Sequence, residues 1–208
     1  MPLVSIDHTG DRAWAIWRIE EDEATLAMRV HPFEKLPGSI SNATKRLEWV
    51  AGRILVKLLL EKLGQSFQGV TKDSYGKPFP VGSPYQLALS HSYPYVTALI
   101  DKHVPVGIDL EQPKAKLLKI APRVLGADEL ADAGTNVIKH CVYWCAKESL
   151  IKVYGKKDLT LAQNIKISPF ELADAGNIVG KIIVNTKETE VSLQYTVTAH
   201  FVVVWSLN

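Results

Sequence analysis

The chain has 208 residues, of which 24 are Lys or Arg, 22 are Asp or Glu, and 47% are hydrophobic. This composition is sufficient for a folded core and excludes disorder as the dominant state. The near balance of charge argues against a dedicated duplex-DNA binder, whose domain is usually strongly basic. No apolar run approaches the ~20 residues that cross a bilayer, and residues 1–8 lack the features of a secretory signal. We therefore expect a cytoplasmic globular protein, with one large or two small domains at ~150 residues per domain.

The first half of the chain predicts a strand at 11–19 and a short helix around Leu26 and Met28. A long helix is predicted over 43–63, because its apolar residues recur at steps of three and four. Ser41 or Asn42 can cap its start, and Gly64 can end it. Further strands are predicted at 86–90, 95–100 and 105–110.

The second half repeats this order. A long helix is predicted from about Asn136 to Tyr154, ending at Gly155. Cys141 and Cys145 lie four residues apart on it, too close for an easy disulfide, and we expect both to be buried core residues. Strands are predicted at 163–167, 180–185, 190–197 and 199–206.

The two long helices share a local pattern, since Trp49–Arg53 resembles Trp144–Glu148 in letters and spacing. We predict an α+β fold with two similar halves, 1–103 and 104–208, related by a pseudo-twofold. Each half would be a long helix packed on a small antiparallel sheet, with a cleft between the halves. The alternative is that two amphipathic helices share a few letters by chance.

Asp109 and Glu111 are separated by one residue in a predicted strand. Residues i and i+2 of a strand point to the same side, so both carboxylates can face one point. Their mutual repulsion can be relieved by a hard cation such as Mg²⁺. The alternative is a solvated strand end.

Glu148 and Lys152 are four residues apart on the second long helix and share one face of it. Cys141 and Cys145 lie on the same stripe, which indicates that the two charges stand at the edge of a buried face. A third carboxylate there would complete a Mg²⁺ site. The alternative is an ordinary surface ion pair.

The first half also carries groups that suit phosphate, because Lys and Arg neutralise it and His can bond to it. No Walker loop or Gly-x-Gly-x-x-Gly motif occurs, and the Ser-His dipeptide lacks the Gly-x-Ser-x-Gly context of a hydrolase. The phosphate-friendly residues are Arg53, Lys72, Lys77, Ser90 and His91.

Over roughly residues 45–160, the chain resembles the 4′-phosphopantetheinyl transferase superfamily, specifically its Sfp type. The order and separation of four motifs carry this resemblance, and the last two are the most specific. The motifs are Gly76-Lys77-Pro78, the run from Leu87 to Ser92, the run from Val106 to Glu111, and the run from Trp144 to Lys152.

The resemblance implies a monomeric enzyme that moves the phosphopantetheinyl arm of coenzyme A to a serine of an apo acyl or peptidyl carrier protein, releasing 3′,5′-ADP. Asp109, Glu111 and Glu148 would bind Mg²⁺ or Mn²⁺. The catalytic residues would be Asp109, Glu148 as general base, and Lys152, which would contact the pyrophosphate. Coenzyme A would be bound by Lys152 together with Arg53, Lys72, Lys77, Ser90 and His91, and Arg46 is an alternative to Arg53.

The carrier domains of such enzymes are typically acidic, which suggests a docking surface after the Asp-x-Glu strand. Its residues would be Lys114, Lys116, Lys119, Arg123, Val124 and Leu125. A solvated basic face is the alternative for this stretch. For the whole chain, the alternatives are a coenzyme A or nucleotide-binding protein without transfer activity, and a metal-dependent phosphodiesterase.

Overall fold

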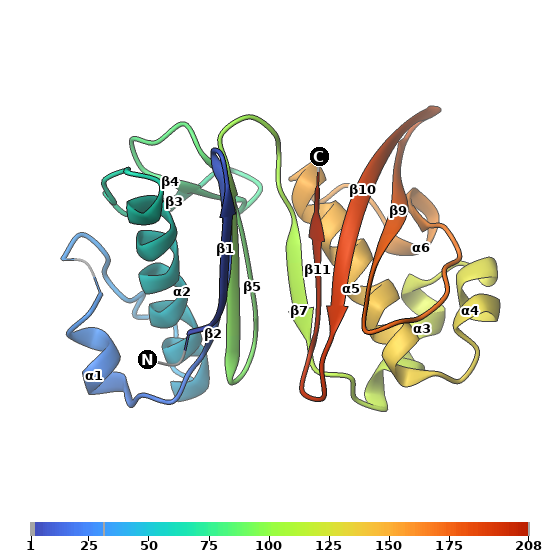
Figure 1. Cartoon of the computed structure of the whole chain (residues 1–208), viewed down its shortest axis with the longest axis horizontal. Coiled ribbons are helices and arrows are strands. Elements are labelled where there is room, and N and C mark those ends of the chain that lie inside the picture. The colour runs from blue at the N-terminus through green and yellow to red at the C-terminus, as the bar shows by residue number, and fades with distance from the viewer. Residues whose placement is uncertain (1–2, 31, 208) are drawn as a thin grey trace. The chain divides into compact units, whose positions relative to one another are not determined.

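The computed structural model describes residues 3–30 and 32–207. The chain divides into two compact units, an N-terminal unit of Met1–Pro105 and a C-terminal unit of Val106–Asn208. Both units combine one long helix with an antiparallel sheet (Figure 1). The predicted α+β class is therefore confirmed.

In the N-terminal unit the predicted long helix is confirmed as α2, Ala43–Lys62. Asn42, and not Ser41, caps it, because the Asn42 side chain accepts a hydrogen bond of 3.0 Å from the amide of Lys45. Strands β1, β3 and β4 were not predicted. The other elements of this unit are β1 (Leu3–Thr9), β2 (Arg12–Arg18), α1 (Glu23–Ala27), β3 (Val70–Lys72), β4 (Pro78–Pro80), β5 (Gln86–Ser92) and β6 (Tyr95–Asp101).

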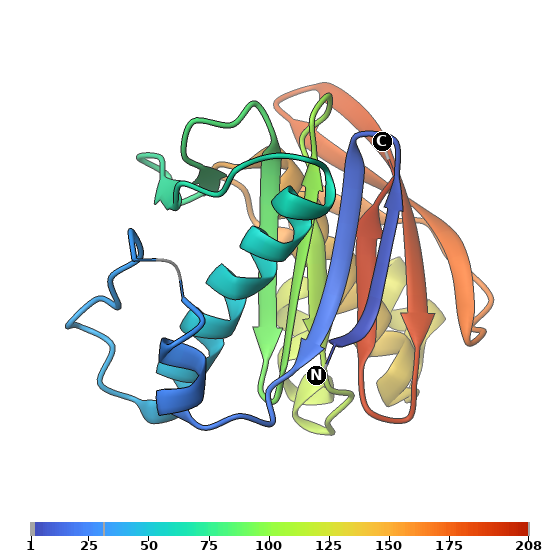
Figure 2. The ribbon, with the colours of Figure 1, turned by 60° about the vertical axis from the view of Figure 1, so that its left-hand side comes forward.

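The main sheet of this unit has the order β1-β2-β6-β5 with every neighbour antiparallel, and β3 pairs with β4 in a separate ribbon. Helix α2 packs against β2, β5 and β6 (Figure 2). Leu55 and Leu59 of α2 are fully buried in one hydrophobic cluster with Trp17 of β2 and Ile100 of β6. This packing holds β5, which carries Ser90 and His91, against the core.

In the C-terminal unit the second predicted long helix is confirmed as α5, Val137–Tyr154, capped by Asn136 and ended by Gly155 in a left-handed conformation. The prediction of a strand from residue 163 is wrong at its start, where α6 occupies Leu161–Asn164. Helices α3 and α4 were not predicted. The other elements are β7 (Ile108–Glu111), α3 (Lys116–Val124), α4 (Ala127–Ala133), β8 (Ile165–Ile167), β9 (Ala175–Val184), β10 (Lys187–Val197) and β11 (Val202–Ser206).

The sheet of the C-terminal unit has the order β7-β11-β10-β9-β8 and is antiparallel throughout. Helix α5 packs across it and contacts every strand of the sheet. Cys141 and Cys145 are free and fully buried within this packing, as expected for small core residues. The sheets of the two units differ in strand number, and the pseudo-twofold stays a prediction.

Within the part of the chain that the structure describes, no helix is long and apolar enough to cross a membrane.

Candidate functional site

The candidate site of the C-terminal unit lies where α5 meets β7. Lys152, in the last turn of α5, donates hydrogen bonds to Asp109 Oδ1 at 2.7 Å and to the carbonyl of Ile108 at 2.8 Å. The Asp109 side chain is 7% exposed, whereas that of Lys152 is 26% exposed. The ammonium therefore pairs with a desolvated carboxylate while part of its side chain remains accessible.

Side-chain donors along one face of α5 hold the helix on β7 and β11. Cys141 Sγ lies 3.8 Å from the carbonyl oxygen of Glu111, and Cys145 Sγ lies 3.9 Å from that of Val202. The Ser149 hydroxyl donates to the carbonyl of Val204 at 2.9 Å. Lys152 continues this row, so three of the four residues of the predicted stripe (Cys141, Cys145, Glu148 and Lys152) make these contacts. Ser149 is a member of the row that sequence analysis missed.

Gly107, just before β7, allows the close approach of the helix. A Cβ atom at this position would overlap the main-chain carbonyl of Ser149. The Gly107 amide donates to Ser206 Oγ at 3.1 Å, and its carbonyl accepts from the Ser206 amide at 2.9 Å. The strand entering the site is thus fixed by β11 on one side and touches the α5 backbone on the other.

Glu148 is half-buried on α5. Burial raises the pKa of its carboxyl, the negative charges of Asp109 and Glu111 raise this pKa further, and the positive charge of Lys152 partly opposes them. Asp109 and Glu111 therefore lie close enough for their charges to act on Glu148. A carboxylate with a raised pKa is a stronger base than an ordinary glutamate, which suits proton abstraction near neutral pH.

Across residues 3–30 and 32–207, no group of three or more His, Cys, Asp or Glu side chains is arranged to hold a metal ion. Asp109 Oδ1 instead accepts a hydrogen bond from Lys152. The donor set nevertheless fits Mg²⁺ chemically, because oxygen ligands whose charges repel one another are stabilised by a hard cation.

Both arginines considered for phosphate binding already have carboxylate partners in the N-terminal unit. Arg53 Nε lies 3.3 Å from Glu34 Oε2, and its guanidinium stacks 4.5 Å from the centre of the Trp49 ring. Arg46 makes two hydrogen bonds to the carboxylate of Glu23, at 2.8 and 2.9 Å. The choice between Arg53 and Arg46 stays open.

His91 is held by a buried carboxylate that sequence analysis did not single out. Its Nδ1 lies 3.2 Å from Glu48 Oε2, and the Glu48 side chain is 2% exposed while that of His91 is 46% exposed. Glu48 also accepts from the amide of Tyr93 at 3.1 Å and pairs with Lys45 at 2.8 Å. Although these contacts fix the His91 ring, much of its imidazole stays accessible at the end of β5. Ser90 beside it is buried.

Lys72 and Lys77 flank the turn that joins β3 to β4. Asp73 organises this turn, since its Oδ1 accepts from the amides of Tyr75 and Lys77, both at 2.9 Å. Lys72 is exposed and Lys77 is half-buried. Burial lowers the pKa of the Lys77 ammonium, against the opposing charge of Asp73.

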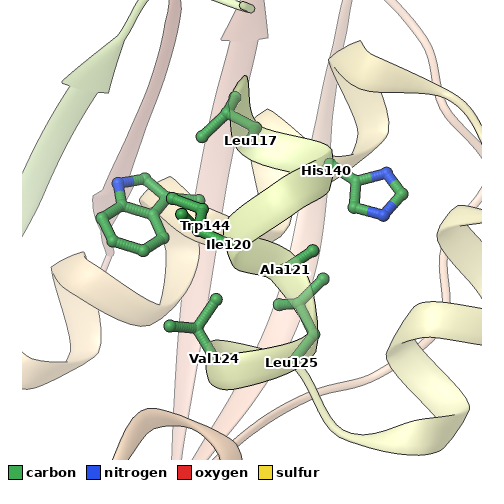
Figure 3. Close-up of a pocket in the computed structure, with 7 residues that line it drawn as sticks. All are labelled: Leu117, Ile120, Ala121, Val124, Leu125, His140 and Trp144. Carbon is green, nitrogen blue, oxygen red and sulfur yellow. The ribbon is translucent and has the colours of Figure 1, made fainter. Parts of the chain in front are cut away.

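The basic residues of the predicted docking surface are exposed on or just before α3, whereas Leu117 and Ala121 of α3 are buried. The prediction that Leu125 supplies an apolar contact is wrong, because Leu125 is only 3% exposed and packs in the core. Val124 is half-buried. A small apolar pocket with no room for a water molecule is lined by residues of α3, by Leu125 and by His140 and Trp144 of α5 (Figure 3).

Three comparisons bear on the family of this chain. Residues 105–205 match the model of the "4′-phosphopantetheinyl transferase superfamily". A "4′-phosphopantetheinyl transferase" of Bacillus subtilis is 34% identical over 105 residues, covering 47% of this chain and 44% of that protein. The "4′-phosphopantetheinyl transferase psf-1" of Bacillus pumilus is 38% identical over 87 residues, covering 39% of this chain and 37% of that protein.

The chain thus matches less than half of the length of each of these relatives. The matched region of the family model contains β7 and α5, and therefore Asp109, Glu111, Glu148 and Lys152. The predicted resemblance to the 4′-phosphopantetheinyl transferase superfamily is therefore confirmed over residues 105–205.

Proposed function

We propose that the protein is a holo-acyl-carrier-protein synthase type enzyme, which transfers the 4′-phosphopantetheinyl arm of coenzyme A to a serine of an apo carrier protein. The observation that carries this proposal is the ion pair of Lys152 with the buried Asp109 carboxylate, close to Glu148 and within the region that matches the family. These groups supply a base and a cation at one place. The transfer of a phosphoryl group to a hydroxyl requires both.

In the proposed reaction, the serine oxygen of the carrier attacks the β-phosphorus of coenzyme A. The bond from that phosphorus to the oxygen bridging it to the α-phosphate breaks, and 3′,5′-ADP leaves. Glu148 accepts the serine proton, directly or through a water molecule. A base is needed here because serine is a poor nucleophile until its proton is removed.

Lys152 would stabilise the negative charge that develops on the leaving pyrophosphate oxygen. Its ammonium is already fixed by Asp109 and the Ile108 carbonyl, so little reorganisation is needed. Asp109, Glu111 and Glu148 would hold Mg²⁺. When bound, Mg²⁺ supplies charge neutralisation at the pyrophosphate.

For the N-terminal unit, we propose that coenzyme A is bound through Lys72, Lys77, Ser90 and His91, with Arg53 or Arg46 as a further phosphate contact. The exposed part of the His91 ring and the exposed ammonium of Lys72 support this, because both are available to an anion.

We propose that the carrier docks on α3 as an acidic protein. Three basic residues of this helix, Lys116, Lys119 and Arg123, are exposed, and Lys114 just before it is exposed too. A cluster of one charge sign attracts a partner of the opposite sign and speeds its association. The half-buried Val124 adds apolar surface to the same region.

The proposal is tested by incubating the protein with coenzyme A, Mg²⁺ and several apo carrier proteins, and then measuring the mass of each carrier. A gain equal to the phosphopantetheinyl group is expected. Bound coenzyme A without a mass gain on any carrier would contradict transfer and favour a non-catalytic binding protein. Hydrolysis of coenzyme A without modification of a carrier would favour a phosphodiesterase.

A further inference from the structure

Lys147 of α5 is fully buried, although lysine is among the residues least often found inside proteins. Its ammonium lies 2.7 Å from Glu129 Oε2 and donates hydrogen bonds to the carbonyls of Leu161 at 2.9 Å and Ile165 at 2.6 Å. An ammonium has three donors, and these three contacts use all of them. The charge is therefore compensated within the core.

Glu129 extends the same network. Its Oε2 accepts from the amide of Gly126 at 2.6 Å, at the start of α4, and its Oε1 accepts from the amide of Ile167 at 2.8 Å, in β8. Through Lys147 and Glu129, α5 is therefore tied to α4, α6 and β8 at one point. The hydrogen bonds from Ser149 and Lys152 tie the helix to β11 and β7.

The position of Lys147 in the helix gives this network a functional consequence. Lys147 directly precedes Glu148 and lies five residues before Lys152. An α-helix is a rigid element, so a small rotation or slide of α5 about its axis moves every side chain on it. Any such movement would displace Glu148 and Lys152 together relative to Asp109.

We propose that Lys147 and Glu129 are positioning residues, which set the rotation of α5 and thereby the geometry of Glu148 and Lys152 against Asp109. The catalytic importance of this positioning rests on the proposed transferase function. A buried ion pair is a costly way to gain stability, because the desolvation of both charges offsets their attraction. It does restrict how the surrounding segments fit together, since each hydrogen bond limits the distance and angle between its partners.

The test compares the wild type with the double variant Lys147→Met with Glu129→Gln, which removes both charges and keeps similar side-chain volumes. Removing one partner alone would leave an uncompensated buried charge, whereas removing both avoids that penalty. The matched control is Lys181→Met with Glu188→Gln, an exposed pair at 2.9 Å on the β9–β10 hairpin. Melting temperature, kcat and the KM for coenzyme A are measured for all three proteins.

For the double variant we expect a melting temperature close to that of the wild type and a kcat at least ten-fold lower, with the KM for coenzyme A within two-fold. A misplacement of about 1 Å can cost up to about 10²-fold in rate. The control pair should leave all three quantities unchanged. A smaller fall in kcat for the double variant, or a KM that rises in parallel with the fall in kcat, would overturn the proposal.

If the double variant does not fold, Lys147→Gln with Glu129→Gln takes its place with the same criteria, because both charges are again removed and the amide at position 129 keeps an oxygen acceptor for the amide of Ile167. A crystal structure of the variant supplies a readout that needs no activity. The Lys152 Nζ to Asp109 Oδ1 distance should lengthen beyond hydrogen-bonding range, and an unchanged distance would overturn the proposal. If the wild type itself transfers nothing, the proposed function fails, and this distance alone then decides whether the pair positions α5.

Discussion

Replacing Gly107 with alanine tests whether the contact between β7 and α5 determines the site. The added Cβ would overlap the carbonyl oxygen and carbon of Ser149 and would lie 3.1 Å from Val153 Cγ2. The obstacle is helix backbone, which cannot rotate away as a flexible side chain can. The Gly107 main chain is also bonded to Ser206 through both its amide and its carbonyl, so it has little freedom to retreat.

Overpacking a well-packed core costs about 1–3 kcal/mol, and we expect Gly107→Ala to reach the upper end, about 3 kcal/mol. For a chain of this size each kcal/mol lowers the melting temperature by about 2–4 °C, so a fall of about 6–12 °C is expected. The activity should fall as well, because β7 carries Asp109 and α5 carries Lys152. A displacement of about 1 Å between them would reduce kcat by up to about 10²-fold.

The assay is thermal unfolding followed by circular dichroism, together with transfer kinetics well below the melting temperature. Two other glycines provide controls. An added Cβ at Gly38 meets nothing within 4 Å, so Gly38→Ala should change stability by less than about 0.5 kcal/mol. Gly52 lies inside α2, where a Cβ would make ordinary contacts at 3.7 and 3.8 Å, so Gly52→Ala should stabilise by up to about 1 kcal/mol. If Gly107→Ala melts within about 2 °C of the wild type, the reasoning is refuted.

Further variants test the charged residues of the site and the docking surface. Asp109→Ala and Glu148→Ala should each abolish transfer, and activity within a few-fold of the wild type would refute their roles. Lys152→Met should lower kcat by at least about 10²-fold and reduce stability, because it leaves the buried Asp109 carboxylate without its cation. Glu148→Gln should raise the melting temperature near pH 8 in the presence of a chelator, because a carboxyl whose pKa is raised by folding destabilises the folded state when it ionises. This gain should vanish near pH 4, where the carboxyl is largely protonated in both states, and a constant gain across that range would contradict it. Lys116→Glu with Arg123→Glu should raise the KM for the carrier and leave that for coenzyme A nearly unchanged, and equal losses for both would exclude docking on α3.

The sequence was sufficient to predict those parts of the site that depend on local periodicity. The bounds of α2 and α5 followed from apolar spacing and terminal caps, and the placement of Asp109 on a strand and Lys152 on a helix followed from the same patterns. Helix α3 was missed although Pro122 lies inside it, since a proline within a sequence usually indicates that a helix ends there. Each of these outcomes depended on residues near one another in the chain.

Contacts between distant segments could not be predicted in this way. The Lys152–Asp109 pair joins residues 43 positions apart, and nothing in either motif requires the ammonium to bond to that carboxylate. Lys147 was missed for a related reason. By residue type a lysine is expected at the surface, and its partners come from α4 and from the main chain of Leu161 and Ile165. Only the tertiary packing reveals that this charge is buried and compensated.

The run from Trp144 to Lys152 thus combines two kinds of residue on one helix. Cys145 and Ser149 are small donors that bond to strand carbonyls, so the helix can lie close to β11 and, at Gly107, to the start of β7. That closeness is what allows the ammonium of Lys152 to reach Asp109. A description of this motif by catalytic roles alone would leave out the residues that determine where the catalytic groups lie. A substitution at a small or buried position of α5 can therefore impair the site without touching any charged residue in it.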